Sequence, residues 1–334
     1  MPNIRVLHFG LGPIGAAIVK QVASRPGFKI VGAIDIDTAK VGRDLGDVVG
    51  LSKRLGVKVS AEAAKALKSA KPDVVVLCTG SSIKDVLPQI ETILKAKVPI
   101  VSTTEELSYP GYTHIRQARL IHAMAKKAKV AVLGTGVNPG FAMDALPIAL
   151  TAVCERVDRI VVHRVQDARI RRLPFQQKIG AGLTTEQFQK KKNDGSVRHV
   201  GLTESIAMIA DAMGWTLDRI TDDIEAKLAT VTISSEYLAV DPGYVAGIIQ
   251  DGVGYRKNEP VIKLHMEAYL GSPETYDSVE IEGSPNLSMK IAGGIHGDVA
   301  TASIVVNSIP KVLQATPGLH TMRDLALPSF FPGR

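Results

Sequence analysis

Residues 5–15 read Arg-Val-Leu-His-Phe-Gly-Leu-Gly-Pro-Ile-Gly, a short apolar run that ends in the pattern Gly10-x-Gly12-x-x-Gly15. This pattern between a strand and a helix is typical of dinucleotide-binding domains. The first glycine allows a tight turn, the second lets the backbone approach a pyrophosphate, and the third lets helix and strand pack closely. Pro13 suits the first helical position. Ile14 follows it at a helix N-terminus, where free N–H groups attract phosphate.

Asp35 lies 20 residues after Gly15, at the end of the next strand-like run. A carboxylate at this distance is expected to bind the adenosine ribose hydroxyls, and we assign Ile36 beside it to the cofactor site as well. Asp35 favours NAD because it repels a 2′-phosphate, whereas Lys40 and Arg43 are close enough in the sequence to tolerate one. We therefore expect NAD or NADP as cofactor, with NAD slightly favoured and dual use allowed.

The first part of the chain alternates strand-like and helical segments. Strand-like runs cover residues 5–9, 29–35, 57–60, 73–79, 99–103 and 130–133, and helical patterns include 14–24, 83–96 and 112–128. This alternation predicts βαβ units around a parallel sheet, so we expect a Rossmann dinucleotide-binding domain over residues 1–135. Because such sheets bind ligands at the carboxyl ends of their strands, the strand ends predict further cofactor contacts. These are Cys78, Thr79, Gly80, Thr103, Gly136 and Asn138.

The pattern of strand-like and helical segments changes after Gly136. Longer strand-like runs cover residues 159–165, 226–234, 261–269, 278–281 and 287–291. They predict a mixed α+β domain for substrate binding and dimerisation over residues 136–297. An apolar helix at about 299–315 is expected to pack back on the first domain, within a C-terminal segment 298–334. The fold class is therefore α/β, with a Rossmann domain and a mixed α+β substrate domain.

Composition excludes several classes of protein. No apolar run is long enough to cross a bilayer, and residues 1–5 enter the first strand without a leader-like pattern. The two cysteines, Cys78 and Cys154, suggest neither a disulfide framework nor a metal site. We expect a cytoplasmic protein with no membrane, nucleic-acid or metal partner.

The net charge of +7 is concentrated in residues 164–199, which carry nine basic and three acidic side chains. Aromatic residues are only 4% of the chain, and no nucleic-acid motif accompanies this basic window. The window is expected to attract an anionic small molecule, although a solvated basic loop is an equal alternative.

Two adjacent carboxylates, Glu105 and Glu106, follow the strand-like run 99–103, where a Rossmann sheet delivers side chains to the nicotinamide. Acidic residues also open helices for purely structural reasons, with Thr104 as the cap. Here Pro110 and Gly111 interrupt the segment before the next helical pattern. The acids are therefore expected on a short turn facing the cofactor crevice.

The chain resembles the amine dehydrogenases related to 2,4-diaminopentanoate dehydrogenase, which are distant relatives of dihydrodipicolinate reductase. The resemblance covers almost the whole chain. It departs from the reductases, which have a Gly where Glu105 stands, a doubled His where His163 is single, and a different loop at Lys178. The sugar and inositol dehydrogenases would need a lysine at Leu107. The motifs that carry the resemblance are residues 102–110 (STTEELSYP), 134–141 (GTGVNPGF), 177–182 (QKIGAG), 201–205 (GLTES) and 293–298 (GGIHGD).

The resemblance implies oxidative deamination of an amine to a ketone and ammonia, and the reverse reaction. A carboxylate near the reacting carbon stabilises the iminium cation and exchanges protons with the amine and water. It implies one catalytic glutamate, for which Glu105 is our choice and Glu106 the fallback, and suggests a homodimer. The alternatives are an imine or enamine reductase and a nucleotide-binding regulator without turnover. The predicted substrate-binding residues are Glu106, Asn138, Phe141, His163, Arg164, Arg169 and Lys178.

Overall fold

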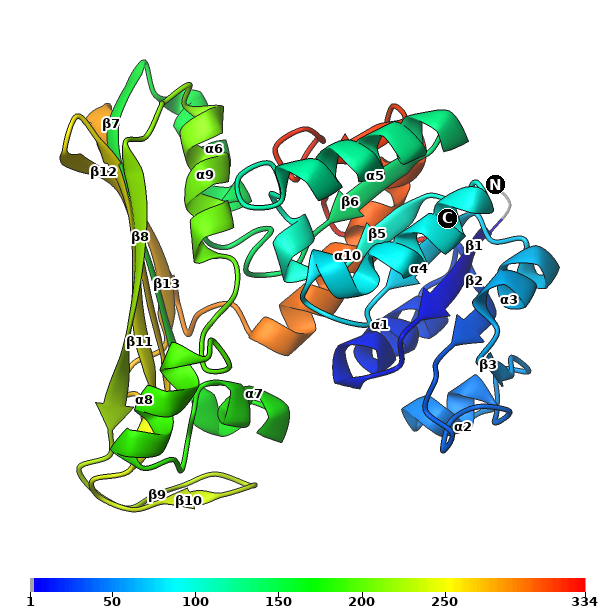
Figure 1. Cartoon of the computed structure of the whole chain (residues 1–334), viewed down its shortest axis with the longest axis horizontal. Coiled ribbons are helices and arrows are strands. Elements are labelled where there is room, and N and C mark those ends of the chain that lie inside the picture. Colours follow the sequence, from blue (N-terminus) through cyan, green and yellow to red (C-terminus); the bar gives the residue numbers. More distant parts are fainter. Residues whose placement is uncertain (1–2, 334) are drawn as a thin grey trace. The chain divides into compact units, whose positions relative to one another are not determined.

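The computed structural model describes residues 3–333. Met1 and Pro2, which open the N-terminal stretch examined for a leader, lie outside the described residues, as does Arg334. The chain divides into two compact units. Unit 1 runs to Phe141 and resumes at Asp298, and unit 2 is Ala142–Gly297 (Figure 1).

Unit 1 is built on a seven-stranded parallel sheet in the order β15-β6-β5-β4-β1-β2-β3. The predicted Rossmann architecture is therefore confirmed. β15 was not predicted from the sequence. The strands are β1 (Ile4–Phe9), β2 (Phe28–Ile34), β3 (Val59–Ser60), β4 (Val74–Leu77), β5 (Ile100–Ser102), β6 (Ala131–Gly134) and β15 (Gly318–His320).

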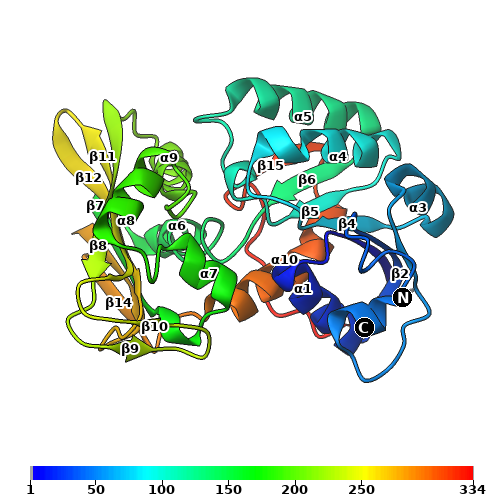
Figure 2. The same ribbon diagram turned by 60° about the horizontal axis from the view of Figure 1, so that its bottom comes forward.

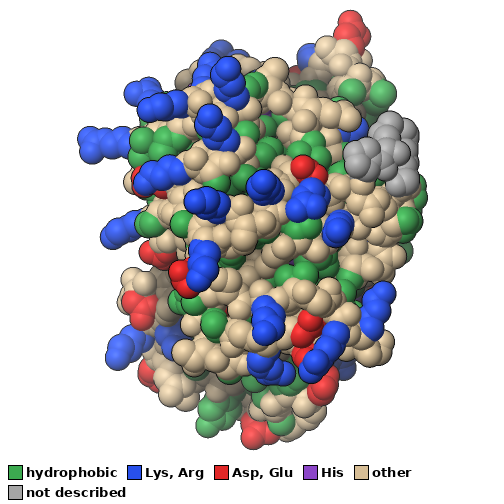
Figure 3. Space-filling view, turned by 90° about the vertical axis from the view of Figure 1, so that its right-hand side faces the viewer, with side chains coloured by type: hydrophobic (Ala, Val, Ile, Leu, Met, Phe, Trp, Pro, Cys, Tyr) green, Lys and Arg blue, Asp and Glu red, His purple; other side chains and the backbone are tan. Residues whose placement is uncertain are grey.

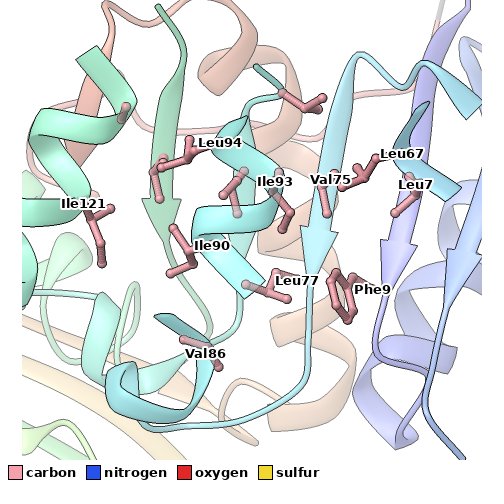
Figure 4. Packing of buried hydrophobic residues seen from close by; sticks show 14 of the residues in the cluster. Leu7, Phe9, Leu67, Val75, Leu77, Val86, Ile90, Ile93, Leu94 and Ile121 are labelled. Carbon is pink, nitrogen blue, oxygen red and sulfur yellow. The ribbon is translucent and has the colours of Figure 1, made fainter. Parts of the chain in front are cut away.

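One apolar cluster of unit 1 lies between the sheet and helix α4 (Ile83–Lys95). Apolar residues of α4 recur every three or four positions, so Val86, Ile90 and Ile93 share one buried face. They pack with Phe9 of β1 and Leu77 of β4 in a cluster shown in Figure 4. All four residues of β4 are buried, as expected for a central parallel strand. The remaining helices before β6 are α1 (Pro13–Ser24), α2 (Leu45–Val49), α3 (Ala63–Ala70), the 3₁₀ turn η1 (Glu105–Leu107) and α5 (Ile115–Ala128).

The C-terminal helix α10 (Gly297–Gln314) lies beside α1 (Figure 2). Gln21 of α1 donates to the Ser303 hydroxyl at 3.0 Å, and Arg25 donates to Asn307 Oδ1 at 2.7 Å. After α10 the chain forms β15, which pairs in parallel with β6. Residues 318–320 therefore add an edge strand to the sheet whose strand β1 leads into the glycine loop.

Unit 2 contains a mixed six-stranded sheet in the order β14-β13-β7-β12-β11-β8. The β7–β12 pair is parallel and the other pairs are antiparallel. A two-stranded sheet joins β9 (Ile233–Ser234) and β10 (Ala239–Val240). The strands of the large sheet are β7 (Arg156–Asp167), β8 (Arg219–Leu228), β11 (Val245–Arg256), β12 (Glu259–Tyr269), β13 (Tyr276–Ser284) and β14 (Leu287–Ala292).

Helix α9 (Leu202–Ala212) packs on one face of this sheet (Figure 1). Gly252 and Gly254 of β11 lie under Ile206, where a Cβ would approach the Ile206 side chain to less than 3 Å. These glycines weaken the strand pattern, which explains why β11 was missed from the sequence. The expected strand over 226–234 was also wrong, because β8 ends at Leu228. The other helices of unit 2 are α6 (Ala145–Leu150), η2 (Thr151–Val153), η3 (Ala168–Ile170), α7 (Leu173–Lys178) and α8 (Thr185–Asn193).

Positive charge is not confined to the basic window. Figure 3 shows one face of the molecule on which Lys and Arg side chains are widespread among apolar and acidic ones. Within the window, Lys190, Lys191 and Lys192 occupy the last turn of α8, where cations interact favourably with the helix dipole. The window therefore includes lysines with a local structural role.

Candidate functional site

The glycine loop of unit 1 has the geometry of a phosphate cradle. Gly10 has φ +94°, and a Cβ there would lie 2.4 Å from the Cys78 carbonyl oxygen. A Cβ on Gly15 would lie 2.1 Å from the Gly10 oxygen, so both positions exclude any other residue. Nothing lies within 4 Å of a Cβ built on Gly12, and helix α1 has Pro13 at its start and no side-chain cap. The open backbone and uncapped helix N-terminus fit the pyrophosphate of a dinucleotide.

The Asp35 carboxylate is tied to the glycine loop. Its Oδ2 accepts a hydrogen bond from the Leu11 N–H at 2.8 Å, and its Oδ1 accepts from the Asp37 N–H at 2.9 Å. Lys40 Nζ lies 3.2 Å from Oδ2. Burial alone would raise the pKa of Asp35, but these N–H donors and the Lys40 ammonium lower it overall. Asp35 is therefore a fixed carboxylate at the end of β2, where a ribose is expected.

Other predicted cofactor residues surround the same strand ends. Ile36, next to Asp35, is 83% exposed, an unusual degree for a large apolar side chain. The Cys78 N–H donates to Phe9 O at 2.7 Å. Burial raises the pKa of the Cys78 thiol to about 12, although a hydrogen bond with Thr103 opposes the shift. This thiol is protonated and suits a packing role rather than nucleophilic chemistry.

The two adjacent glutamates have different surroundings. Glu106 Oε2 accepts a hydrogen bond from the Ile83 N–H at 2.8 Å, at the first residue of α4. The same oxygen lies 3.2 Å from His114 Nε2. The Glu106 N–H donates to Ser81 O at 3.1 Å. Glu106 thus supplies the side-chain acceptor that Ser82, the N-cap residue of α4, does not provide.

Glu105 occupies the first position of η1, directly after the buried turn that leaves β5. The Ser102 hydroxyl donates to Leu77 O at 3.0 Å and bonds with the Thr104 hydroxyl at 2.9 Å. The Ser108 hydroxyl donates to Glu105 O at 2.7 Å. These bonds fix the backbone on both sides of Glu105, which is half-buried. The Glu105 side chain is therefore attached to a fixed backbone segment at the carboxyl end of a central strand.

The loop after β6 packs against this turn. A Cβ on Gly134 would lie 2.5 Å from the Leu107 carbonyl group, and the Thr135 N–H donates to Ser102 O at 2.8 Å. Further along the same loop, Asn138 is buried and Phe141 is half-buried. The structure therefore brings the β5 and β6 strand ends together.

Sequence reasoning did not find Thr301. Its hydroxyl accepts a hydrogen bond from the Val137 N–H at 3.4 Å, and its methyl lies 3.8 Å from a Cβ built on Gly136. Thr301 belongs to α10, far along the chain from β6. Only the apolar periodicity of that helix was readable in the sequence, which does not single out one threonine.

In unit 2, Arg164 is committed to an intramolecular ion pair. The side chain is 2% exposed, and its Nη1 lies 2.5 Å from Asp277 Oδ1. Its Nη2 donates to Ile295 O at 2.9 Å, while Asp277 Oδ2 accepts from the Ile295 N–H at 2.6 Å. This network joins β7, β13 and the loop after β14. The geometry favours a structural role for Arg164 over the predicted contact with a substrate carboxylate.

His163 and Arg164 are consecutive residues of β7, so their side chains point to opposite faces of the sheet. The His163 ring centroid lies 5.2 Å from that of His265. Burial and the neighbouring His265 lower the pKa of His163. The sheet therefore presents these two predicted substrate residues on opposite faces.

Arg169 also has a local acidic partner. Its Nε donates to Asp167 Oδ2 at 2.7 Å, but its side chain remains 47% exposed. Lys178 ends α7. Both residues remain predicted substrate contacts, and the Arg169 guanidinium is more accessible than that of Arg164.

His199 is a second residue that the sequence did not single out. The residue is 8% exposed, and no described residue hydrogen bonds to its Nε2. The Gln250 side chain holds its backbone, accepting from the His199 N–H at 2.9 Å and donating to its carbonyl at 3.0 Å. Burial, then the charges of Lys178, Arg164 and Arg171, place the pKa of His199 well below its usual value. A neutral imidazole therefore lies among three basic side chains of unit 2.

Among residues 3–333, none of the helices has the length and hydrophobicity that a bilayer-spanning segment requires. No group of three or more His, Cys, Asp or Glu side chains in the same range is arranged to hold a metal ion.

Comparisons with known proteins agree with this geometry. Residues 141–333 match the family model of the 2,4-diaminopentanoate dehydrogenase C-terminal domain, and residues 4–134 match that of the dihydrodipicolinate reductase N-terminus. A 2,4-diaminopentanoate dehydrogenase from Acetoanaerobium sticklandii is 34% identical over 100% of this chain and 96% of its own length. An amine dehydrogenase from Streptomyces virginiae is 24% identical over 97% and 96%. The structure of an amine dehydrogenase from Mycobacterium smegmatis superposes with a TM-score of 0.89 at 26% identity, covering 99% and 98% of the two chains.

Proposed function

Because the chain belongs to the 2,4-diaminopentanoate dehydrogenase family of oxidoreductases, we propose that it is an NAD(P)-dependent amine dehydrogenase. It oxidises an amine to a ketone and ammonia and runs the reductive amination in reverse. The two relatives and the solved structure named above, a diaminopentanoate dehydrogenase and two amine dehydrogenases, support this reaction class.

The observation that carries the proposal is that the adjacent residues Glu105 and Glu106 have different structural surroundings. Glu106 closes the start of α4 through the Ile83 N–H and pairs with His114. Glu105 stands on the rigid turn after β5, where parallel sheets place ligand-binding groups. We therefore assign the chemistry to Glu105 and the helix-capping role to Glu106.

Glu105 has three tasks in the proposed reaction. It takes a proton from the substrate ammonium, which exposes the nitrogen lone pair that expels the hydride, and it passes this proton to solvent so that the carboxylate is ionised again. Its negative charge stabilises the iminium cation as it forms. It then takes a proton from the water that attacks the iminium carbon and returns it to the nitrogen, so that the C–N bond breaks to release ammonia while the hydroxyl proton leaves to solvent and the ketone forms. In the reverse direction the same carboxylate positions ammonia against the ketone.

The bound nicotinamide cofactor supplies or accepts the hydride. We propose that the open backbone at Gly12 and the N-terminus of α1 hold its pyrophosphate, and that Asp35 holds the adenosine ribose. The exposed Ile36 and the strand-end residues Thr79 and Thr103 complete the predicted cofactor surface. The burial and fixed geometry of these elements are consistent with that assignment.

Substrate recognition is proposed for Asn138 and Phe141 of unit 1 and for Arg169 and Lys178 of unit 2. Positive charge at Arg169 and Lys178 suits the carboxylate of a diamino acid. Arg164 is omitted because Asp277 and Ile295 already use its guanidinium. A cytoplasmic homodimer remains the prediction for location and assembly.

The reaction is tested by following NADH and NADPH absorbance with ketones, with and without ammonium, and with 2,4-diaminopentanoate in the oxidative direction. Ammonium-dependent oxidation of the reduced cofactor is the expected result. Turnover of an imine that does not depend on ammonium would instead support the alternative reductase function. The absence of turnover in all assays, with intact cofactor binding, would support a nucleotide-binding regulator.

The Glu105→Gln variant tests the residue assignment. It keeps the size of the side chain but removes its charge, so kcat should fall by about 10² or more. NADH affinity, measured by fluorescence titration, should stay within about threefold, because Glu105 is assigned to the substrate.

Glu106→Gln is the matched control. Its amide oxygen still accepts from the Ile83 N–H, but the charge beside His114 is lost, so thermal stability should fall while kcat stays within a few-fold. A large loss of kcat in this variant alone would transfer the catalytic role to Glu106. Full activity in both variants would contradict the proposed use of a carboxylate.

A further inference from the structure

Lys40 forms an ionic bridge at the ribose end of the glycine loop. Its Nζ lies 3.2 Å from Asp35 Oδ2 and 3.3 Å from Asp37 Oδ2. The Lys40 side chain is 26% exposed, compared with 10% for Asp35 and 46% for Asp37. The ammonium group is therefore partly accessible to a ligand.

The backbone fixes this arrangement independently of the ammonium group. Asp37 O accepts hydrogen bonds from the Lys40 N–H at 2.9 Å and the Val41 N–H at 3.0 Å, which turns the chain back toward Asp35. The Asp35 carboxylate keeps the Leu11 and Asp37 N–H donors even without Lys40. Lys40 can thus leave Asp35 without stripping that carboxylate of its backbone donors.

The bridge changes how Asp35 acts on a cofactor. An isolated Asp35 charge would repel the 2′-phosphate that distinguishes NADP from NAD. Lys40 offsets that charge, and Arg43, on the same turn, donates to Ala39 O rather than to either aspartate. Together, Asp35, Asp37, Lys40 and Arg43 carry no net charge, so the summed charge of this turn does not exclude either form of the cofactor.

We propose that Lys40 determines cofactor specificity, bridging Asp35 and Asp37 when the ribose carries hydroxyl groups and turning to the 2′-phosphate when it is present. The site then accepts both NADH and NADPH. This inference rests on the proposed use of a nicotinamide dinucleotide, but it does not depend on the amine chemistry.

The exchange is close to balanced because a phosphate monoester carries a charge of about −1.5 to −2 at pH 7, similar to that of the two carboxylates that Lys40 leaves. Burial alone would lower the pKa of Lys40, but its bonds to Asp35 and Asp37 raise it overall. Lys40 is therefore charged at neutral pH and binds the phosphate as a cation. The two aspartates remain solvated or hydrogen bonded after it moves.

The test is fluorescence titration of the Lys40→Met variant with NADPH and NADH. NADPH affinity should fall by about tenfold or more, the scale of one lost charged hydrogen bond. NADH affinity should change by less than about threefold, because its ribose does not recruit the ammonium. Adenosine 2′,5′-bisphosphate should lose affinity in parallel with NADPH, whereas AMP should not.

Two variants separate this role from a general effect. Lys40→Arg keeps the charge and should retain most NADPH binding. Lys53→Met removes an exposed charge from the same connection between β2 and β3 and should alter neither affinity. Equal losses for NADPH and NADH in Lys40→Met, or an unchanged NADPH affinity, would overturn the inference. Because these are binding measurements, they stand even if no amine is turned over.

Discussion

A buried histidine in the cofactor-binding unit predicts a strong pH dependence of stability. His8 of β1 is 1% exposed, and within residues 3–333 neither ring nitrogen has a hydrogen-bond partner. It points to the face of β1 opposite Leu7 and Phe9, which belong to the apolar cluster under α4. Burial lowers the pKa of His8 from 6.5 to about 3. The folded protein therefore keeps His8 neutral in mild acid.

The shift translates directly into a loss of stability in acid. In the unfolded chain His8 takes up a proton as the pH falls through 6.5, whereas in the fold it does so only near pH 3. Above pH 6.5 the lowered pKa of His8 does not reduce the free energy of unfolding. Between pH 6.5 and pH 3 it reduces this free energy progressively as the pH falls. Each pH unit inside this window costs about 1.4 kcal/mol. Moving from pH 7.5 to 5.0 should therefore cost about 2 kcal/mol through His8 alone.

The measurement compares urea unfolding of the wild type and His8→Leu, followed by circular dichroism at pH 7.5 and 5.0. The variant should be less sensitive to acid by about 2 kcal/mol. It should also gain about 1–3 kcal/mol at pH 7.5, because it removes buried polar atoms without partners. The titrations of all other groups cancel in the comparison. Between pH 7.5 and 9.0 the difference between the two proteins should stay constant. Equal acid sensitivity of the two proteins would refute the reasoning.

Two further predictions concern the arginines of unit 2. Arg164→Met should lower the unfolding free energy of unit 2 by about 3–5 kcal/mol, because it leaves Asp277 buried without its cation. The change can be followed by fluorescence of Trp215, the one tryptophan of the chain, and Arg164→Met combined with Asp277→Asn should recover part of the loss. Arg169→Met should raise KM for a diamino acid by about tenfold, as expected for a lost charged hydrogen bond, and leave KM for a neutral amine of similar length unchanged. Equal increases for both substrates would assign Arg169 to structure.

The parallel sheet of unit 1 was predictable because the sequence patterns that indicate its strands and helices are local. The four valine and leucine residues of β4 are apolar on both faces, and α1 begins at a proline directly after the glycine loop. β11 escaped prediction because Gly252 and Gly254 replace the expected large residues under α9. Their small size matters only once the helix is in place, so the information is tertiary rather than local.

In the candidate site, too, local features were predictable from the sequence and tertiary contacts were not. The positions of Glu105 and Asp35 followed from their distance to strand ends, which is a local property. The partners of Glu106 and Arg164 did not, because Ile83 and Asp277 are remote in sequence from them. The sequence alone therefore could not show that Glu106 and Arg164 have structural partners that distinguish them from nearby residues of the same charge.

The pairing of β15 with β6 has a consequence for biosynthesis. During synthesis, residues 3–141 emerge from the ribosome before the rest of unit 1. Their sheet lacks the edge strand β15, and helix α1 lacks its neighbour α10, until residues 298–320 have emerged. Unit 2 is synthesised in between and has the chance to fold while the nucleotide-binding half is still incomplete. Any excised version of that half must join both chain segments, since a simple C-terminal truncation before residue 298 would expose the β6 edge and the α1 surface that α10 covers.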